Sequence, residues 1–217
     1  MIMNESVLKN FNDSQLLIEE FFTQAGEEGR DLYNEISFQI EFGIFLRNKF
    51  PEYKVEFERN VGDLFGTKEG FIKKEIDVII RRSSNELLWA FELKFPRRGQ
   101  HPEQMFKIVE DIKFCEELKN RGFQRSTQIT LVDKDQGDGN LFIEGASLTG
   151  IYAYFRTSDI SNLKGSKKLE GEIFKPTGEG KDMKKYTLEG TYQINWNKTD
   201  NLNQNIIYFC VDTHSEK

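Results

Sequence analysis

The segment EIDVIIRRSSNELLWAFELKF constrains the fold of this chain more than any other stretch. Residues 76–80 and 87–95 within it are rich in β-branched and aromatic side chains, and a polar segment separates them. This pattern predicts a β-hairpin. The apolar run over residues 87–91 is almost continuous, which favours a central strand covered on both faces over an edge strand.

Three charged residues interrupt this apolar hairpin. Glu92 and Lys94 are two residues apart, so both point to the same face, and Asp77 lies on the neighbouring strand. Charges in such strands are costly to bury without a purpose, and a divalent metal ion supplies one. Carboxylate oxygens at Asp77 and Glu92 suit Mg²⁺ or Mn²⁺. The alternative is a charged ladder on the exposed face of an edge strand, where such pairs stabilise a sheet only slightly.

Length and composition limit the class of protein. At 217 residues the chain is long enough for one large domain with a sizeable core. Its net charge of −6 argues against nonspecific coating of DNA, but allows a local basic patch beside a metal site. We find no run of about 18 apolar residues, no secretory signal pattern, and only two, widely separated cysteines. We therefore expect a cytoplasmic protein that does not associate with a membrane.

Helical and strand patterns alternate along the first part of the chain. We predict helices over residues 13–23 and 31–50, a strand over 54–60, the hairpin, a helix from Pro102 to the stop at Gly122, and a strand over 126–133. From about residue 135, short apolar runs alternate with Gly, Asn and Lys, which indicates mostly β structure. We predict a single domain over residues 1–217, with an α/β core at 31–133 and a β-rich extension at 134–217 packed on it.

The predicted helix over residues 31–50 is apolar on two sides. Ile36, Ile40 and Ile44 form one arc when the residues are placed at about 100° each, and four larger apolar residues, Phe38, Phe42, Phe45 and Leu46, form another. A helix of this kind is expected to be covered on both sides.

The order of elements and the charged hairpin resemble the PD-(D/E)xK nuclease superfamily, which includes restriction endonucleases, over roughly residues 31–133. Asp77 matches the first carboxylate of the motif, Glu92 the second and Lys94 the lysine, while Ile76 stands in place of the proline. The segments NEISFQIEFGIFLR and ELKFPRRGQHPEQMFKIVEDIKFCEELK look like those of an uncharacterised bacterial branch of this superfamily. The resemblance implies a restriction endonuclease-like α/β fold, with a central mixed β-sheet flanked by helices.

The resemblance also implies roles for these residues. Asp77 and Glu92 would hold Mg²⁺ (or Mn²⁺), with the carbonyl of Leu93 completing the coordination. Lys94 would orient the attacking water and offset charge in the transition state.

A further acidic residue is usual on the preceding helix of the superfamily, and two candidates compete for that position. Glu35 lies in the arc of Phe42 and Leu46, so it should point toward packed structure, and it is favoured because an inward carboxylate is harder to explain by solvation. Glu41 lies in a polar gap of the helix and remains the alternative.

Residues after the hairpin could contact a substrate. Arg97 and Arg98 follow Lys94 closely and could reach phosphates, although a solvated loop would have the same composition. Gln104 begins the next helix and would face the metal site, as in related nucleases, unless it is an ordinary surface glutamine.

These observations predict a Mg²⁺-dependent endonuclease acting on DNA, with a restriction or other defence role by family analogy. The alternative is a catalytically silent nucleic-acid or protein binding module on the same fold. DNA is the expected partner, and the sequence leaves a homodimer open.

Overall fold

A six-stranded mixed sheet forms the centre of the computed structural model, which describes residues 13–97, 99, 101–135, 139–157, 163–176, 184–199 and 202–213. The strands are β1 (Lys54–Asn60), β2 (Glu75–Arg81), β3 (Leu87–Lys94), β4 (Arg125–Asp133), β5 (Leu169–Phe174), β6 (Lys185–Tyr192), β7 (Asn197–Lys198) and β8 (Ile206–Thr213). The helices are α2 (Ser14–Glu27), α3 (Glu35–Lys49), α4 (Val61–Phe65), α5 (His101–Asn120) and α6 (Tyr152–Phe155), with a short 3₁₀ turn at Gly139–Phe142.

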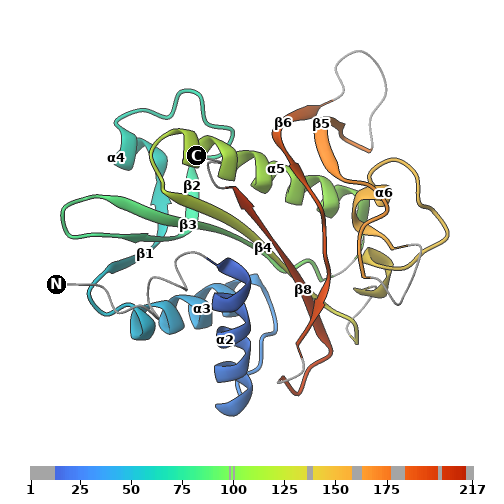
Figure 1. Ribbon diagram of the computed structural model, residues 1–217, viewed down its shortest axis with the longest axis horizontal. Helices are drawn as coiled ribbons and strands as arrows, with labels where there is room; N and C mark the ends of the chain where they lie inside the picture. The colour runs from blue at the N-terminus through green and yellow to red at the C-terminus, as the bar shows by residue number, and fades with distance from the viewer. Residues whose placement is uncertain are drawn as a thin grey trace.

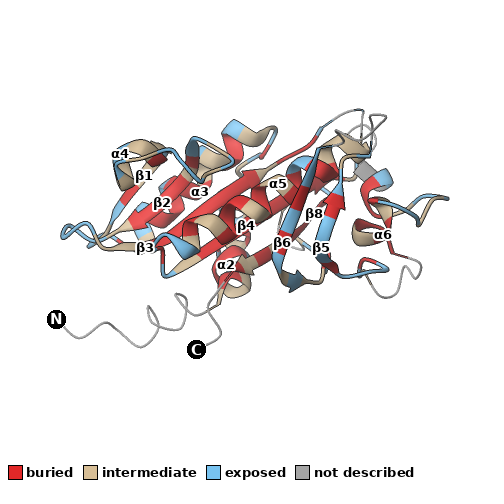
Figure 2. Ribbon diagram, turned by 90° about the horizontal axis from the view of Figure 1, so that it is seen from above, coloured by how far each residue is buried: buried red, intermediate tan, exposed pale blue. Residues whose placement is uncertain are grey.

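The order of strands in the sheet is β1-β2-β3-β4-β8-β7. β3 and β4 are parallel, because the chain crosses over through α5 between them, and the other pairs are antiparallel. The predicted mixed α/β architecture, with a β-rich C-terminal part, is confirmed. The hairpin prediction is also confirmed: β3 lies between β2 and β4 rather than at an edge, and it is almost entirely buried (Figure 2).

Helices cover both faces of this sheet (Figure 1). On one face, α2 and α3 pack a cluster of phenylalanines against Trp89, Phe91 and Leu93 of β3. On the other face, α5 packs against the sheet and also against β5 and β6, which form a separate two-stranded hairpin. Within the part of the chain that the structure describes, no helix has the length and apolar character needed to span a bilayer.

The N-terminal helices differ in their limits from the predicted ranges. α3 begins at Glu35 rather than residue 31, because Asn34 and Ser37 form a capping box. The Ser37 N–H donates to the Asn34 side chain, and the Asn34 N–H donates to the Ser37 hydroxyl oxygen. α2 continues to Glu27, beyond the predicted end at Thr23. Gly29, at φ 65°, ends it, and the Arg30 N–H donates to the Ala25 carbonyl at 2.8 Å.

The expectation that α3 is covered on both sides was wrong. The phenylalanine arc is buried, but Ile36, Ile40 and Ile44 are 64%, 49% and 36% exposed. α3 meets the sheet on one side only, and it approaches β1 closely at Gly43, where a Cβ would lie 2.1 Å from the Phe57 ring.

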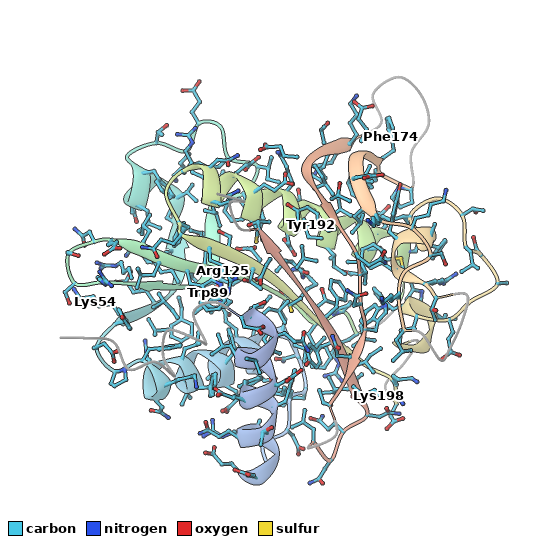
Figure 3. All side chains as sticks on the ribbon, viewed as in Figure 1. Lys54, Trp89, Arg125, Phe174, Tyr192 and Lys198 are labelled. Carbon is cyan, nitrogen blue, oxygen red and sulfur yellow. The ribbon has the colours of Figure 1, made fainter. Side chains whose placement is uncertain are left out.

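The C-terminal part contributes to the central sheet as well as packing on it. β8 pairs with β4 along its whole length, from Asp133 opposite Ile206 to Ser126 opposite Thr213. β6 packs against α5, where the Tyr192 hydroxyl (labelled in Figure 3) donates to the Glu116 carboxylate at 2.8 Å. The predicted boundary near residue 134 therefore runs through the sheet itself.

Candidate functional site

β2 and β3 stop pairing through their main chains where the two predicted carboxylates face each other. The ladder ends at Val78 opposite Phe91, so Asp77 and Glu92 form the next cross-strand pair. The Leu93 N–H donates to Asp77 Oδ2 at 2.7 Å, and the Asp77 N–H donates to Glu92 Oε1 at 3.3 Å. Side-chain oxygens thus replace main-chain carbonyls as acceptors, which positions both carboxylates between the strands.

Lys94 and Glu35 meet beside this pair. Lys94 Nζ lies 3.3 Å from Glu35 Oε1, and the other Glu35 oxygen accepts from the Phe95 N–H at 3.1 Å. Glu35 is the first residue of α3, so the capped end of this helix brings the carboxylate to the end of β3. Of the two predicted helix acids, Glu35 reaches the site, whereas Glu41 pairs with Arg30.

Two further charged residues join the site, and the sequence analysis missed both. Asp111 of α5 is 3% exposed. The Lys73 ammonium, from the loop before β2, contacts Glu92 and lies 2.8 Å from Asp111 Oδ1. Lys94 Nζ lies 3.5 Å from the second Asp111 oxygen. A signal for Asp111 was present, because it lies one helical turn from both Ile108 and Cys115 on the apolar face of α5.

Uncharged and flanking residues complete the surroundings of Asp77. The Gln39 side chain of α3 donates to the Asp77 carbonyl at 2.9 Å and to Glu58 Oε1 at 2.5 Å. Glu58 has φ 49°, a left-handed conformation that is uncommon outside glycine. On the other side of β3, Gln128 of β4 lies beside Glu92 in the parallel register. Neither glutamine nor Glu58 was predicted to take part.

Burial raises the pKa values of Glu92 and Asp77. Burial, followed by the charge of Asp77, raises the pKa of Glu92 well above its usual value. Burial likewise raises the pKa of Asp77 to about 6, against the opposing effects of Lys73 and the Leu93 N–H. The ladder alternative required exposed charges on an edge strand, and Glu92 is fully buried on a central one.

The two lysines remain ammonium ions. Desolvation alone would lower the pKa of Lys94, but Asp111 and Glu35 outweigh it and the pKa is raised. The pKa of Lys73 is raised as well, because Glu92, Asp111 and Asp77 outweigh its desolvation. A protonated Lys94 suits electrostatic stabilisation and the orientation of a water rather than proton abstraction.

Of the remaining predicted residues, all but Arg98 belong to the part of the chain that the structure describes. Arg97 is exposed and follows β3 by three residues, and Arg98 lies outside the described residues. Gln104 is half-buried, two turns before Asp111 on the same side of α5. Leu93 donates its N–H to Asp77, and its side chain packs on the opposite face of the sheet.

The donor chemistry of the site fits a hard divalent cation. Asp77, Glu92 and Asp111 supply carboxylate oxygens, the ligands that Mg²⁺ and Mn²⁺ prefer. Two buried oxygens, Asp111 Oδ2 and Gln128 Oε1, have no hydrogen-bond partner among the described residues. The Lys73 ammonium contacts both Glu92 and Asp111. Among the described residues, no three Asp, Glu, His or Cys side chains are grouped closely enough to bind one metal ion without rearrangement.

Comparison with known proteins assigns no role to these residues. No protein-family model matches the chain, and it matches neither a curated protein nor a solved structure.

Proposed function

We propose that this protein is a Mg²⁺- or Mn²⁺-dependent phosphodiester hydrolase acting on DNA, of the PD-(D/E)xK kind. The observation that carries the proposal is the meeting of Asp77, Glu92 and Lys94 with Glu35 at one end of a central hairpin. Strongly perturbed ionisable groups in a shared site are typical of catalytic centres.

In this proposal Asp77 and Glu92 hold the metal ion, with the Leu93 carbonyl as a further ligand implied by the resemblance. A bound divalent ion polarises a phosphate, lowers the pKa of a bound water and stabilises the leaving oxygen. The Lys94 ammonium orients the attacking water and offsets the negative charge that develops on the phosphate. Glu35 orients Lys94 through its carboxylate, and its bond to the Phe95 N–H prevents it from swinging away.

Contacts with DNA in this proposal come from residues next to the site. Arg97 and Arg98 follow Lys94 in the sequence and would bind backbone phosphates. Gln104, in the first turn of α5, would be a further contact. With a net charge of −6, the chain would bind DNA through this local patch and the metal rather than through a broad basic surface.

One observation favours a second candidate, a catalytically silent binding module on the same fold. The Lys73 ammonium already neutralises part of the carboxylate charge by contacting Glu92 and Asp111. A site permanently neutralised in this way would not need a metal.

Cleavage assays separate the two candidates. We expect the wild-type chain to cleave double-stranded, single-stranded or branched DNA with Mg²⁺ or Mn²⁺. Lys94→Met should reduce the rate at least about a hundredfold, because the transition-state charge loses its ammonium. The control is Lys54→Met, at an exposed position on β1 (Figure 3) that lies opposite Arg81 and not opposite Asp77, and this variant should cleave at the wild-type rate. A wild-type chain inert on every DNA would favour the silent module.

A further inference from the structure

The position a metal ion would take in this site is already held by a positive charge of the protein. Lys73 Nζ contacts Glu92, lies 2.8 Å from Asp111 Oδ1, and is attracted by Asp77. An ammonium has three N–H donors, so it can satisfy three carboxylates at once. It also lies 5.4 Å from the centre of the Phe114 ring, a distance at which the face of an aromatic ring attracts a cation.

The charges of the site do not balance with this lysine alone. Four carboxylates, Glu35, Asp77, Glu92 and Asp111, face two ammonium groups, Lys73 and Lys94, which leaves two formal negative charges. Replacing the Lys73 ammonium by a divalent cation reduces this excess to one formal negative charge. The exchange is therefore favoured by the electrostatics of a site where a carboxylate is fully buried.

Oxygens that accept no hydrogen bond are available for such a cation. Asp111 Oδ2 and Gln128 Oε1 are buried and accept no hydrogen bond among the residues described, and Asp111 Oδ2 has only the Lys94 ammonium at 3.5 Å as a charged neighbour. Gln128 is 0% exposed, and its neighbour across the parallel ladder is Glu92, so its side chain lies on the same face of the sheet. A buried amide or carboxylate oxygen without a partner is costly, and ligation of a metal removes that cost.

Lys73 is also the member of the cluster that can leave. Its side chain is 25% exposed, whereas those of Glu92 and Asp111 are 0% and 4% exposed. The loop that carries it stays attached to α5 through the Ile72 N–H on Glu117 and the Arg121 guanidinium on the Glu69 carbonyl. A flexible lysine side chain can therefore turn to solvent while its backbone stays docked.

We propose that Lys73 and a divalent cation compete for one position, and that Asp111 becomes a third carboxylate ligand when the cation displaces the ammonium. The inference rests on the proposed function for its choice of cation. Lys73 then acts as an internal counter-ion that holds the carboxylates together without metal and sets the metal concentration at which the site fills.

Calorimetric titration with Mn²⁺, without nucleic acid, tests this exchange. Lys73→Met removes the competing charge at similar side-chain length and should bind Mn²⁺ at least about tenfold more tightly than the wild type. Lys74→Met, at the exposed neighbouring position, is the matched control and should bind like the wild type. Adding Asp111→Asn to Lys73→Met should weaken binding at least about tenfold. Lys73→Met binding no more tightly than the wild type, or an Asp111→Asn change without effect, would overturn the proposal.

A second measurement uses the wild-type chain and covers the case in which Lys73→Met does not fold. Acetylation of Lys73, followed by mass spectrometry, should increase several-fold relative to that of Lys74 when saturating Mn²⁺ is added, because the freed ammonium enters solvent. Unchanged or reduced labelling overturns the exchange. A chain that shows the exchange but cleaves no DNA would remove the proposed function and leave this inference standing.

Discussion

At the scale of single residues, the main problem is the charge of Glu92. Its carboxylate is fully buried, and the Asp77 N–H and the Lys73 ammonium are its hydrogen-bond donors. A buried ion pair stabilises a protein only if its geometry recovers the cost of desolvation. The raised pKa values of Glu92 and Asp77 indicate that this recovery is incomplete.

A pH-dependent stability follows for Asp77. Its pKa is raised from 3.8 to about 6, so its contribution to stability is fully present below about pH 4 and is lost as the pH rises through about 6. Asp77→Asn keeps an oxygen acceptor for the Leu93 N–H and removes the buried charge. In chelator, we expect it to raise the free energy of unfolding by about 2 kcal/mol at about pH 8 and by much less at about pH 4, measured by urea denaturation.

Asp63→Asn is the control for this experiment. Asp63 is an exposed carboxylate on α4, and its substitution should leave the stability almost unchanged at both pH values. An equal effect of Asp77→Asn at both pH values would contradict the assignment of the raised pKa.

At the scale of elements, α5 carries two buried acids that serve different partners. Asp111 faces the sheet and the candidate site, whereas Glu116 faces β6. Glu116 accepts from the Glu189 N–H at 2.9 Å, the Gly190 N–H at 2.8 Å and the Tyr192 hydroxyl at 2.8 Å. This carboxylate thus links the β5–β6 hairpin to the helix that also supplies the site, in addition to the apolar contacts between them.

Glu116→Ala should loosen the attachment of residues 189–192 to α5. It leaves two main-chain N–H groups without their acceptor, which costs about 2–4 kcal/mol in the free energy of unfolding. Hydrogen exchange should become faster at the amides of Glu189 and Gly190, and Glu116→Gln, which retains one acceptor oxygen, should show a smaller change. Lys107→Ala, at an exposed position on α5, is the control. Unchanged exchange at both amides in Glu116→Ala would contradict this role.

At the scale of the whole molecule, the first and last of the described elements, α2 and β8, pack together. α2 lies on β8, where Gln15 donates to the Tyr208 hydroxyl at 2.7 Å, Ser14 donates to Asp212 at 2.6 Å, and the Phe22 and Tyr208 rings are 4.8 Å apart. β8 in turn covers the edge of β4. The segment 31–133 therefore lacks two of the elements that complete its own core.

We expect a fragment of residues 31–133 not to fold on its own. It would expose the edge of β4 and the phenylalanine cluster that α2 covers, and both features promote aggregation. Circular dichroism should show no cooperative thermal transition in the fragment, in contrast to the full chain. A sharp transition with a monomeric elution profile would show instead that residues 31–133 form an independent domain.

The sequence by itself determined the parts of this protein that depend on neighbours in the chain. Alternation and turn composition predicted β1, the β2–β3 hairpin and β4, and so placed Asp77 and Glu92 on neighbouring strands. A register shift between Ile80 and Arg81, which the sequence did not predict, sets the two residues opposite each other. The inward position of Asp111 was readable from its spacing on α5, although it was not recognised.

Only the tertiary structure decided which distant segments meet at the site. Lys73 reaches Asp111 because the β3–α5–β4 crossover lays α5 over the hairpin, and Gln128 lies beside Glu92 because β4 is parallel to β3. The pairing of β8 with β4 is likewise a long-range contact. The side of α3 that carries Ile36, Ile40 and Ile44 stays exposed because no other described element packs on it. These contacts join residues far apart in sequence, and no local periodicity encodes which faces will pack together.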